Sequence, residues 1–173
     1  MSLKVYSPQL ARLAEAHFGR KPRQPSLAEL RAFYKRARRY LAHDVLWFDD
    51  AQRKGVAEAC AEVILRHRLT CYACAVLRNH VHLLICKHKL KGQQMHRLFR
   101  EAAKDKLSAD KLVPADHPVF SADVLDVFKS DPSSVQTCIA YIEGNFAKHG
   151  LAPGKYEFTV PYDRWPFHKR LAE

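Results

Sequence analysis

Two histidines one residue apart stand in an otherwise apolar run, "VLRNHVHLLI", residues 76–85. On a β-strand, positions i and i+2 point to the same face, so His80 and His82 can offer both imidazoles to one ion. Val81 and Leu83 would then pack behind them. An edge strand with two solvated or hydrogen-bonded histidines is the competing interpretation, and for a single histidine it would be the better one. For the pair, the spacing favours a two-nitrogen metal site.

A tyrosine and an asparagine stand one turn apart in a predicted helix over residues 132–148. At about 100° per residue, Tyr141, Asn145 and Lys148 form one stripe along the flank of this helix. In such an arrangement Tyr141 is a candidate nucleophile, Asn145 an oxygen-bearing ligand and Lys148 a cation for a phosphate. A tyrosine packed at the edge of the core is the commoner outcome, and the spacing alone leaves both open. The apolar stripe beside it consists of Val135, Cys138, Ile139, Ile142 and Phe146.

Two segments, "CAVLRNHVHLLI" and "CIAYIEGNFAKHGL", resemble the two signatures of the single-tyrosine HUH transposases (histidine, hydrophobic residue, histidine), especially the REP-associated tyrosine transposases. With the later "VPYDRWPF" segment, the resemblance covers about residues 45–168. It implies that His80 and His82 are metal ligands and that Tyr141 is the catalytic nucleophile. Asn145 would be a further ligand.

The activity that this resemblance implies is metal-dependent nicking and strand transfer on single-stranded or hairpin DNA. A divalent ion, Mg²⁺ or Mn²⁺, would polarise the scissile phosphate while Tyr141 attacks phosphorus, which gives a 5′-phosphotyrosine and a free 3′-hydroxyl. A second strand end can then attack the adduct without ATP, and relatives often act as homodimers. The chain departs from the family pattern at Phe146 and Arg78, where proline is usual.

Two other functions stay open at this point. A catalytically silent, domesticated relative would bind nucleic acid through the same fold without cutting it. A zinc hydrolase would use His80, His82 and one cysteine as ligands. A covalent DNA adduct, DNA binding without cleavage, or bound zinc with thiolate ligands would distinguish the three.

The charge of the chain indicates a polyanionic partner. Twenty-nine Lys and Arg against 18 Asp and Glu give a formal net charge of +11, which favours nucleic acid or an anionic membrane surface. No apolar run approaches the ~20 residues of a membrane span, and the N-terminus lacks a signal peptide, so we expect a cytoplasmic, nucleoid-associated protein. The first candidates for phosphate contacts, with solvated side chains as the alternative, are Lys87, Lys89, Lys91, Arg97 and Arg100.

Five cysteines lie mostly in apolar segments, which indicates reduced, buried thiols. Cys71 and Cys74 form a C-x-x-C pair, a spacing that also occurs in zinc sites. In a strand, however, positions three apart point to opposite faces. We therefore expect both to be core residues and not ligands of one metal.

The remaining patterns predict the elements that position these residues. The basic segment 1–45 reads as a helical N-terminal extension, in which Ser26 and Glu29 form a capping box. In the catalytic core, residues 46–173, helices are expected over about 51–67, 92–107 and 132–148, and a hairpin over 70–77 and 81–87. "LKVYS" or "HDVLWF" supplies a first strand, and "HPVF" or "VLDVF" a last one. The prediction is a single α+β domain with a ferredoxin-like antiparallel sheet and helices on one face.

Overall fold

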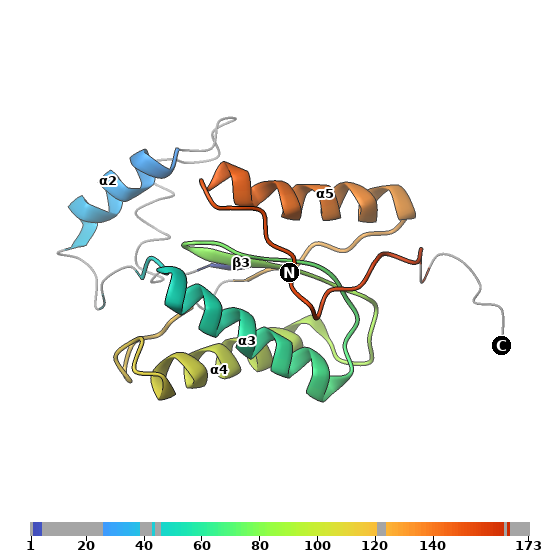
Figure 1. The fold of residues 1–173 in the computed structure, drawn as a ribbon, viewed down its shortest axis with the longest axis horizontal. Coiled ribbons are helices and arrows are strands. Elements are labelled where there is room, and N and C mark those ends of the chain that lie inside the picture. Colours follow the sequence, from blue (N-terminus) through green and yellow to red (C-terminus); the bar gives the residue numbers. More distant parts are fainter. Residues whose placement is uncertain are drawn as a thin grey trace.

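The computed structural model describes residues 2–4, 26–38, 43, 46–120, 124–164 and 166. The described chain combines helices with an antiparallel sheet, which agrees with the predicted mixture of α and β elements, while the ferredoxin-like arrangement stays a prediction (Figure 1). In chain order its elements are β1 (Ser2–Lys4), α2 (Leu27–Ala37), α3 (Asp50–His67), β2 (Cys71–Val76), β3 (His80–Ile85), α4 (Gly92–Ala109), β4 (Val124–Leu125) and α5 (Pro132–Lys148).

The sheet is built around the predicted hairpin. Its strand order is β2-β3-β1-β4, and β1 runs antiparallel to both β3 and β4. In the register of β1 with β3, Lys4 is opposite His80 and Ser2 is opposite His82. The first strand is Ser2–Lys4, which overlaps the start of "LKVYS", whereas residues 46–48 of "HDVLWF" are not in a strand. β4 falls within "VLDVF".

Local capping explains where the helices begin. Ser26 and Glu29 form the predicted capping box at the start of α2. Asp49 accepts a hydrogen bond from the backbone N–H of Gln52 at the start of α3. Asp131 caps α5, whose first residue is a proline that has no N–H to leave unsatisfied. These bonds satisfy N–H groups that have no partner inside the helix, so the helix positions follow from the nearby sequence.

The helices cover both faces of the sheet, so the prediction that they cover one face was wrong. In Figure 1, α3 and α4 lie on one side of the sheet and α5 lies on the other. Val76, Val81 and Leu83 belong to the apolar cluster shared with α3 and α4. Ala75 and Leu77 belong to a second cluster with α5. Because all six residues of β2 are buried, this strand needs an apolar layer on each side.

The paired cysteines are core residues, as predicted, but not for the predicted reason. A register shift between Cys71 and Ala73 interrupts the alternation of β2. Cys71 and Cys74 therefore lie in the same apolar cluster, together with Cys60. Burial raises the pKa of the Cys71 thiol to about 12, so this thiol is protonated at neutral pH and is a poor metal ligand.

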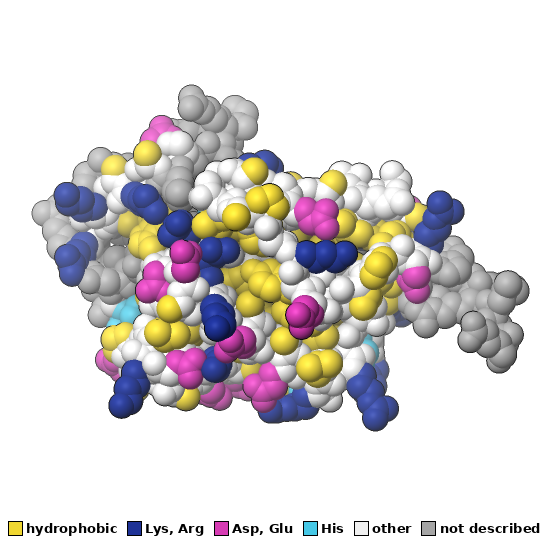
Figure 2. All heavy atoms as spheres, in the orientation of Figure 1, with side chains coloured by type: hydrophobic (Ala, Val, Ile, Leu, Met, Phe, Trp, Pro, Cys, Tyr) yellow, Lys and Arg dark blue, Asp and Glu magenta, His cyan; other side chains and the backbone are white. Residues whose placement is uncertain are grey.

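Two further features bear on possible partners. Figure 2 shows Lys and Arg side chains spread over this face of the molecule among acidic ones. No helix in the described part of the chain is long and apolar enough to cross a membrane.

Candidate metal and nucleophile site

The alternation of β3 places the two histidines on the α5 side of the sheet. Val81 and Leu83 are fully buried on the other side, against α3 and α4. His80 and His82 are half-buried, and their Nε2 atoms are 2.9 Å apart. Two ring nitrogens cannot both direct lone pairs at each other at this distance without repulsion. The geometry therefore requires a proton or a cation between them.

The separation of the two Nε2 atoms fits a metal ion. Imidazole nitrogens bind metals at about 2.1 Å. Two such ligands are then about 3.0 Å apart at a right angle and about 3.4 Å apart at the tetrahedral angle. The observed 2.9 Å is close to the separation of adjacent ligands in an octahedron, the geometry that Mg²⁺ requires, and it is also an ordinary length for a hydrogen bond between the two rings.

The protonation state of His82 suits this role. Burial lowers the pKa of its imidazole to about 4, and positive charge at His149 and Lys148 adds to the effect. The ring is therefore neutral at physiological pH. Metal-binding histidines need this neutral form, because only the neutral ring has a free lone pair.

Asn79 orients the first histidine. Its Oδ1 lies 2.8 Å from Nδ1 of His80. Since an amide oxygen only accepts hydrogen bonds, Nδ1 carries the proton, and the lone pair is on Nε2, the atom that faces His82. The strand spacing did not single out Asn79, because this residue lies in the turn between β2 and β3, outside the strand period. The only sequence signal was its position beside His80.

Tyr141 and Lys148 lie next to the histidine pair. The rings of Tyr141 and His82 meet edge to face with their centroids 5.6 Å apart. Lys148 Nζ lies 4.7 Å from the centroid of the Tyr141 ring, within the range of a cation–π interaction. Tyr141 is 51% exposed, so this tyrosine is accessible from solvent. The structure thus brings together residues from β3 and α5, far apart in the sequence.

His149, which the sequence analysis did not single out, lies at the edge of this group. Its ring centroid is 5.4 Å from that of His80. Burial lowers the pKa of this imidazole, as do the charges of Arg78 and Lys148. Its Nδ1 is buried without a hydrogen-bond partner among the described residues. Even so, the described residues contain no set of three His, Cys, Asp or Glu side chains placed to share one metal ion.

Asn145 lies one turn from Tyr141, as the helix period predicts, and only 4% of it is exposed. Its Nδ2 donates a 2.7 Å hydrogen bond to the backbone carbonyl of Tyr141. This bond turns the amide nitrogen toward its own helix. The predicted role of Asn145 as an oxygen ligand stays a prediction.

The predicted phosphate-contacting residues divide between the two sides of the sheet. Lys148 lies beside Tyr141. Lys87, Lys89 and Lys91 are exposed in and at the end of the loop that joins β3 to α4. Arg97 and Arg100 are on α4, which packs across the sheet from α5. One short contact region cannot therefore include all of them.

Comparisons of the chain with protein-family models, with curated proteins and with solved structures find no match.

Proposed function

We propose that the protein nicks and rejoins single-stranded or hairpin DNA through a 5′-phosphotyrosine intermediate, with Mg²⁺ or Mn²⁺ as cofactor. The observation that carries this proposal is the meeting of three side chains from two elements. The Nε2 atoms of His80 and His82 converge to 2.9 Å, and the ring of Tyr141 contacts His82. The two HUH-type motifs support the proposal, and so would a ferredoxin-like arrangement of the sheet.

The chemistry needs a nucleophile, a place for the phosphate and a way to stabilise the leaving group. A divalent ion held by His80 and His82 would supply Lewis-acid stabilisation of the charge that develops on the phosphate and on the departing 3′-oxygen. The phenolic oxygen of Tyr141 forms a bond to phosphorus as the bond from phosphorus to the 3′-oxygen breaks. The phenolic proton passes to solvent, and the 3′-oxygen takes up a proton from solvent.

Side chains around Tyr141 favour this step electrostatically. Lys148 lies over its ring at 4.7 Å, so positive charge is present where the phosphate and the developing phenolate would lie. Asn79 favours the His80 tautomer in which Nδ1 carries the proton and Nε2 the lone pair. Attack of a second strand's 3′-hydroxyl on the phosphotyrosine reverses the bond changes and restores Tyr141.

An adduct assay tests the proposal. Wild-type protein with 5′- or 3′-labelled hairpin DNA and Mn²⁺ is expected to form a denaturant-resistant adduct that retains only the DNA 3′ of the nick. The adduct should be lost in Tyr141→Phe and in His82→Ala. Tyr162→Phe is the matched control, because the Tyr162 hydroxyl has no hydrogen-bond partner among the described residues, and this variant should react like the wild type.

The other outcomes of the assay decide between the alternatives. DNA that is bound but not cut with either metal would identify a silent DNA-binding relative. Tightly bound zinc with thiolate ligands would favour a zinc hydrolase, although burial raises the pKa values of the Cys71 and Cys74 thiols and so opposes this outcome. An adduct that persists in Tyr141→Phe would overturn the assignment of the nucleophile.

A further inference from the structure

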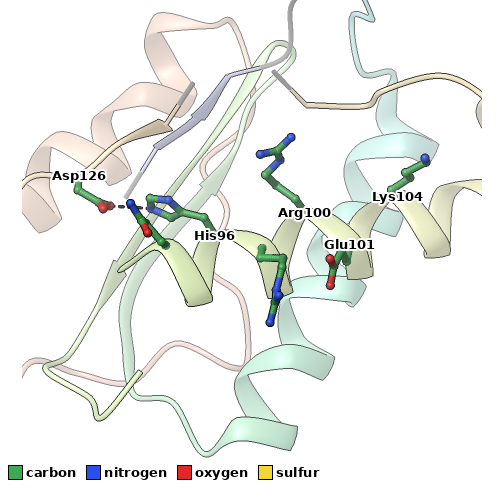
Figure 3. A pocket seen from close by; sticks show the side chains of 7 residues that line it. His96, Arg100, Glu101, Lys104 and Asp126 are labelled. Atoms are coloured by element: carbon green, nitrogen blue, oxygen red, sulfur yellow. Dashed lines mark hydrogen bonds and ion pairs between the residues drawn. The ribbon is translucent and has the colours of Figure 1, made fainter. Parts of the chain in front are cut away.

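A pocket of about 620 Å³ lies on α4, away from the α5 side of the sheet that carries His80, His82 and Tyr141. It combines residues of α4 with the chain segment that follows β4 (Figure 3). Its lining consists of Gln93, His96, Arg97, Arg100, Glu101, Lys104 and Asp126.

The pocket presents cations that form no ion pair with any carboxylate in the described part of the chain. Arg100 and Lys104 are four residues apart, so they lie one above the other on α4, about 6 Å apart along its axis. Figure 3 shows Glu101 pointing away from both. Within the described residues, no ion pair joins Arg97, Arg100 or Lys104 to a carboxylate. Three such positive charges beside one pocket favour an anionic ligand.

The acidic residue at the end of the pocket is already engaged. Asp126 Oδ1 lies 2.6 Å from Nε2 of His96, which is 7% exposed. The carboxylate also lies against the first turn of α4, since a Cβ at Gly92 would be 2.6 Å from its Oδ2. The N–H groups of a helix start favour a negative charge there. Asp126 therefore fixes the segment after β4 to α4, and its carboxylate pairs with His96 and, among the described residues, not with Arg100.

An exposed aromatic side chain, Phe128, comes two residues after Asp126 in the sequence. Phe128 is 88% exposed and Val127 is 54% exposed. Phe128 is two residues beyond Asp126, so their Cα atoms are within about 7 Å. A flat apolar ring that is open to solvent next to a basic pocket is the combination that single-stranded nucleic acid requires. The phosphates contact the cations and the unpaired bases stack on the ring.

We infer that this pocket, together with Phe128, is a second binding site for single-stranded DNA. Arg97, Arg100 and Lys104 contact successive phosphates, and Phe128 stacks on an unpaired base. The choice of DNA as ligand rests on the proposed function, but binding at this site requires neither the metal nor Tyr141.

The test of the phosphate contacts is a binding titration in EDTA with a fluorescent oligo(dT) of about 20 nucleotides. The variant Arg97→Gln/Arg100→Gln/Lys104→Gln is expected to bind at least about 10-fold more weakly. The slope of log K against log salt should become shallower by about 2, because each phosphate contact to a single strand contributes about 0.7. The control removes the same charge elsewhere, through Lys54→Gln/Arg66→Gln/Lys155→Gln at exposed positions. Equal weakening by both variants, or by neither, would overturn the site.

The aromatic contact has a separate test. Phe128→Ala should weaken binding of the single strand by about 5- to 100-fold and leave binding of a duplex of the same length unchanged. Equal effects on both DNAs, or no effect, would remove Phe128 from the site.

These binding tests are independent of the adduct assay. Loss of binding in the α4 variant without any adduct in the wild type would keep this inference and reject the proposed reaction. An adduct in the wild type with unchanged binding by the α4 variant would do the reverse.

Discussion

Asn79 offers a sharp test of the histidine pair, because it acts on the metal only through His80. On the back of the His80 ring, Nδ1 lies 2.8 Å from Asn79 Oδ1. The variant Asn79→Leu removes this acceptor with little change in size. Loss of this acceptor raises the population of the tautomer with the proton on Nε2, the atom that faces His82, and a protonated Nε2 cannot bind a metal.

The expected effect follows from the strength of one bond. A hydrogen bond of this kind contributes about 0.5 to 1.5 kcal/mol net. Partners of metal-binding histidines typically account for about 10- to 100-fold in metal affinity. Since about 1.4 kcal/mol corresponds to tenfold, one hydrogen bond supports the lower end of that range. We therefore expect about a 10-fold weaker Mn²⁺ affinity in Asn79→Leu and a larger loss in His80→Ala.

Calorimetric titration of the purified protein with Mn²⁺ measures both affinities. Asn79→Asp is the matched control, because a carboxylate still accepts from Nδ1 and should keep or strengthen metal binding. Thermal unfolding without metal shows that the variants are folded. If Asn79→Leu binds Mn²⁺ like the wild type while His80→Ala does not, the assignment of the His80 tautomer is wrong.

Three further predictions concern the core. In the native protein a thiol reagent should modify Cys138 first, because the other four thiols are buried; more than one fast-reacting thiol in a spectrophotometric assay would contradict this. Burial raises the pKa values of Cys71 and Tyr156 to about 12, so the unfolded chain ionises first, and the free energy of unfolding should fall as pH rises from about 9 toward 12. Urea titrations at several pH values measure this decrease, and a flat profile would refute it. Phe146→Ala should reduce the free energy of unfolding by about 3 to 5 kcal/mol, whereas the exposed Phe128→Ala should change it by less than about 0.5 kcal/mol; urea titration of both variants tests the contrast.

The elements themselves could be predicted because their signals are local. α5 runs from Pro132 to Lys148, as expected from "SDPSS" and from the apolar period. α3 begins after Asp49, whose side chain caps it. The hairpin of β2 and β3 follows from two apolar runs separated by "RN". In each case the deciding interaction joins residues a few positions apart, and a short stretch of sequence contains both partners.

The candidate site could be predicted only in part. The period of a strand put His80 and His82 on one face, and the period of a helix put Tyr141 and Lys148 on one stripe. Neither period shows that β3 and α5 meet. Nor does either period show that Asn79 and His149 lie beside His80. The family resemblance supplied the expectation that the histidine pair and the Tyr141 stripe meet. The packing of α5 on β2 and β3 brings them together.

The sequence by itself determined the chemical character of this protein: a basic chain with two imidazoles aligned on one strand and a tyrosine on the last helix. Only the tertiary structure decided that α5 covers the face opposite α3 and α4, that a register shift turns Cys71 and Cys74 to the same side, and that Asp126 reaches His96. These outcomes depend on which apolar surfaces fit together over long chain separations. Local hydrogen bonding and side-chain period do not encode that fit.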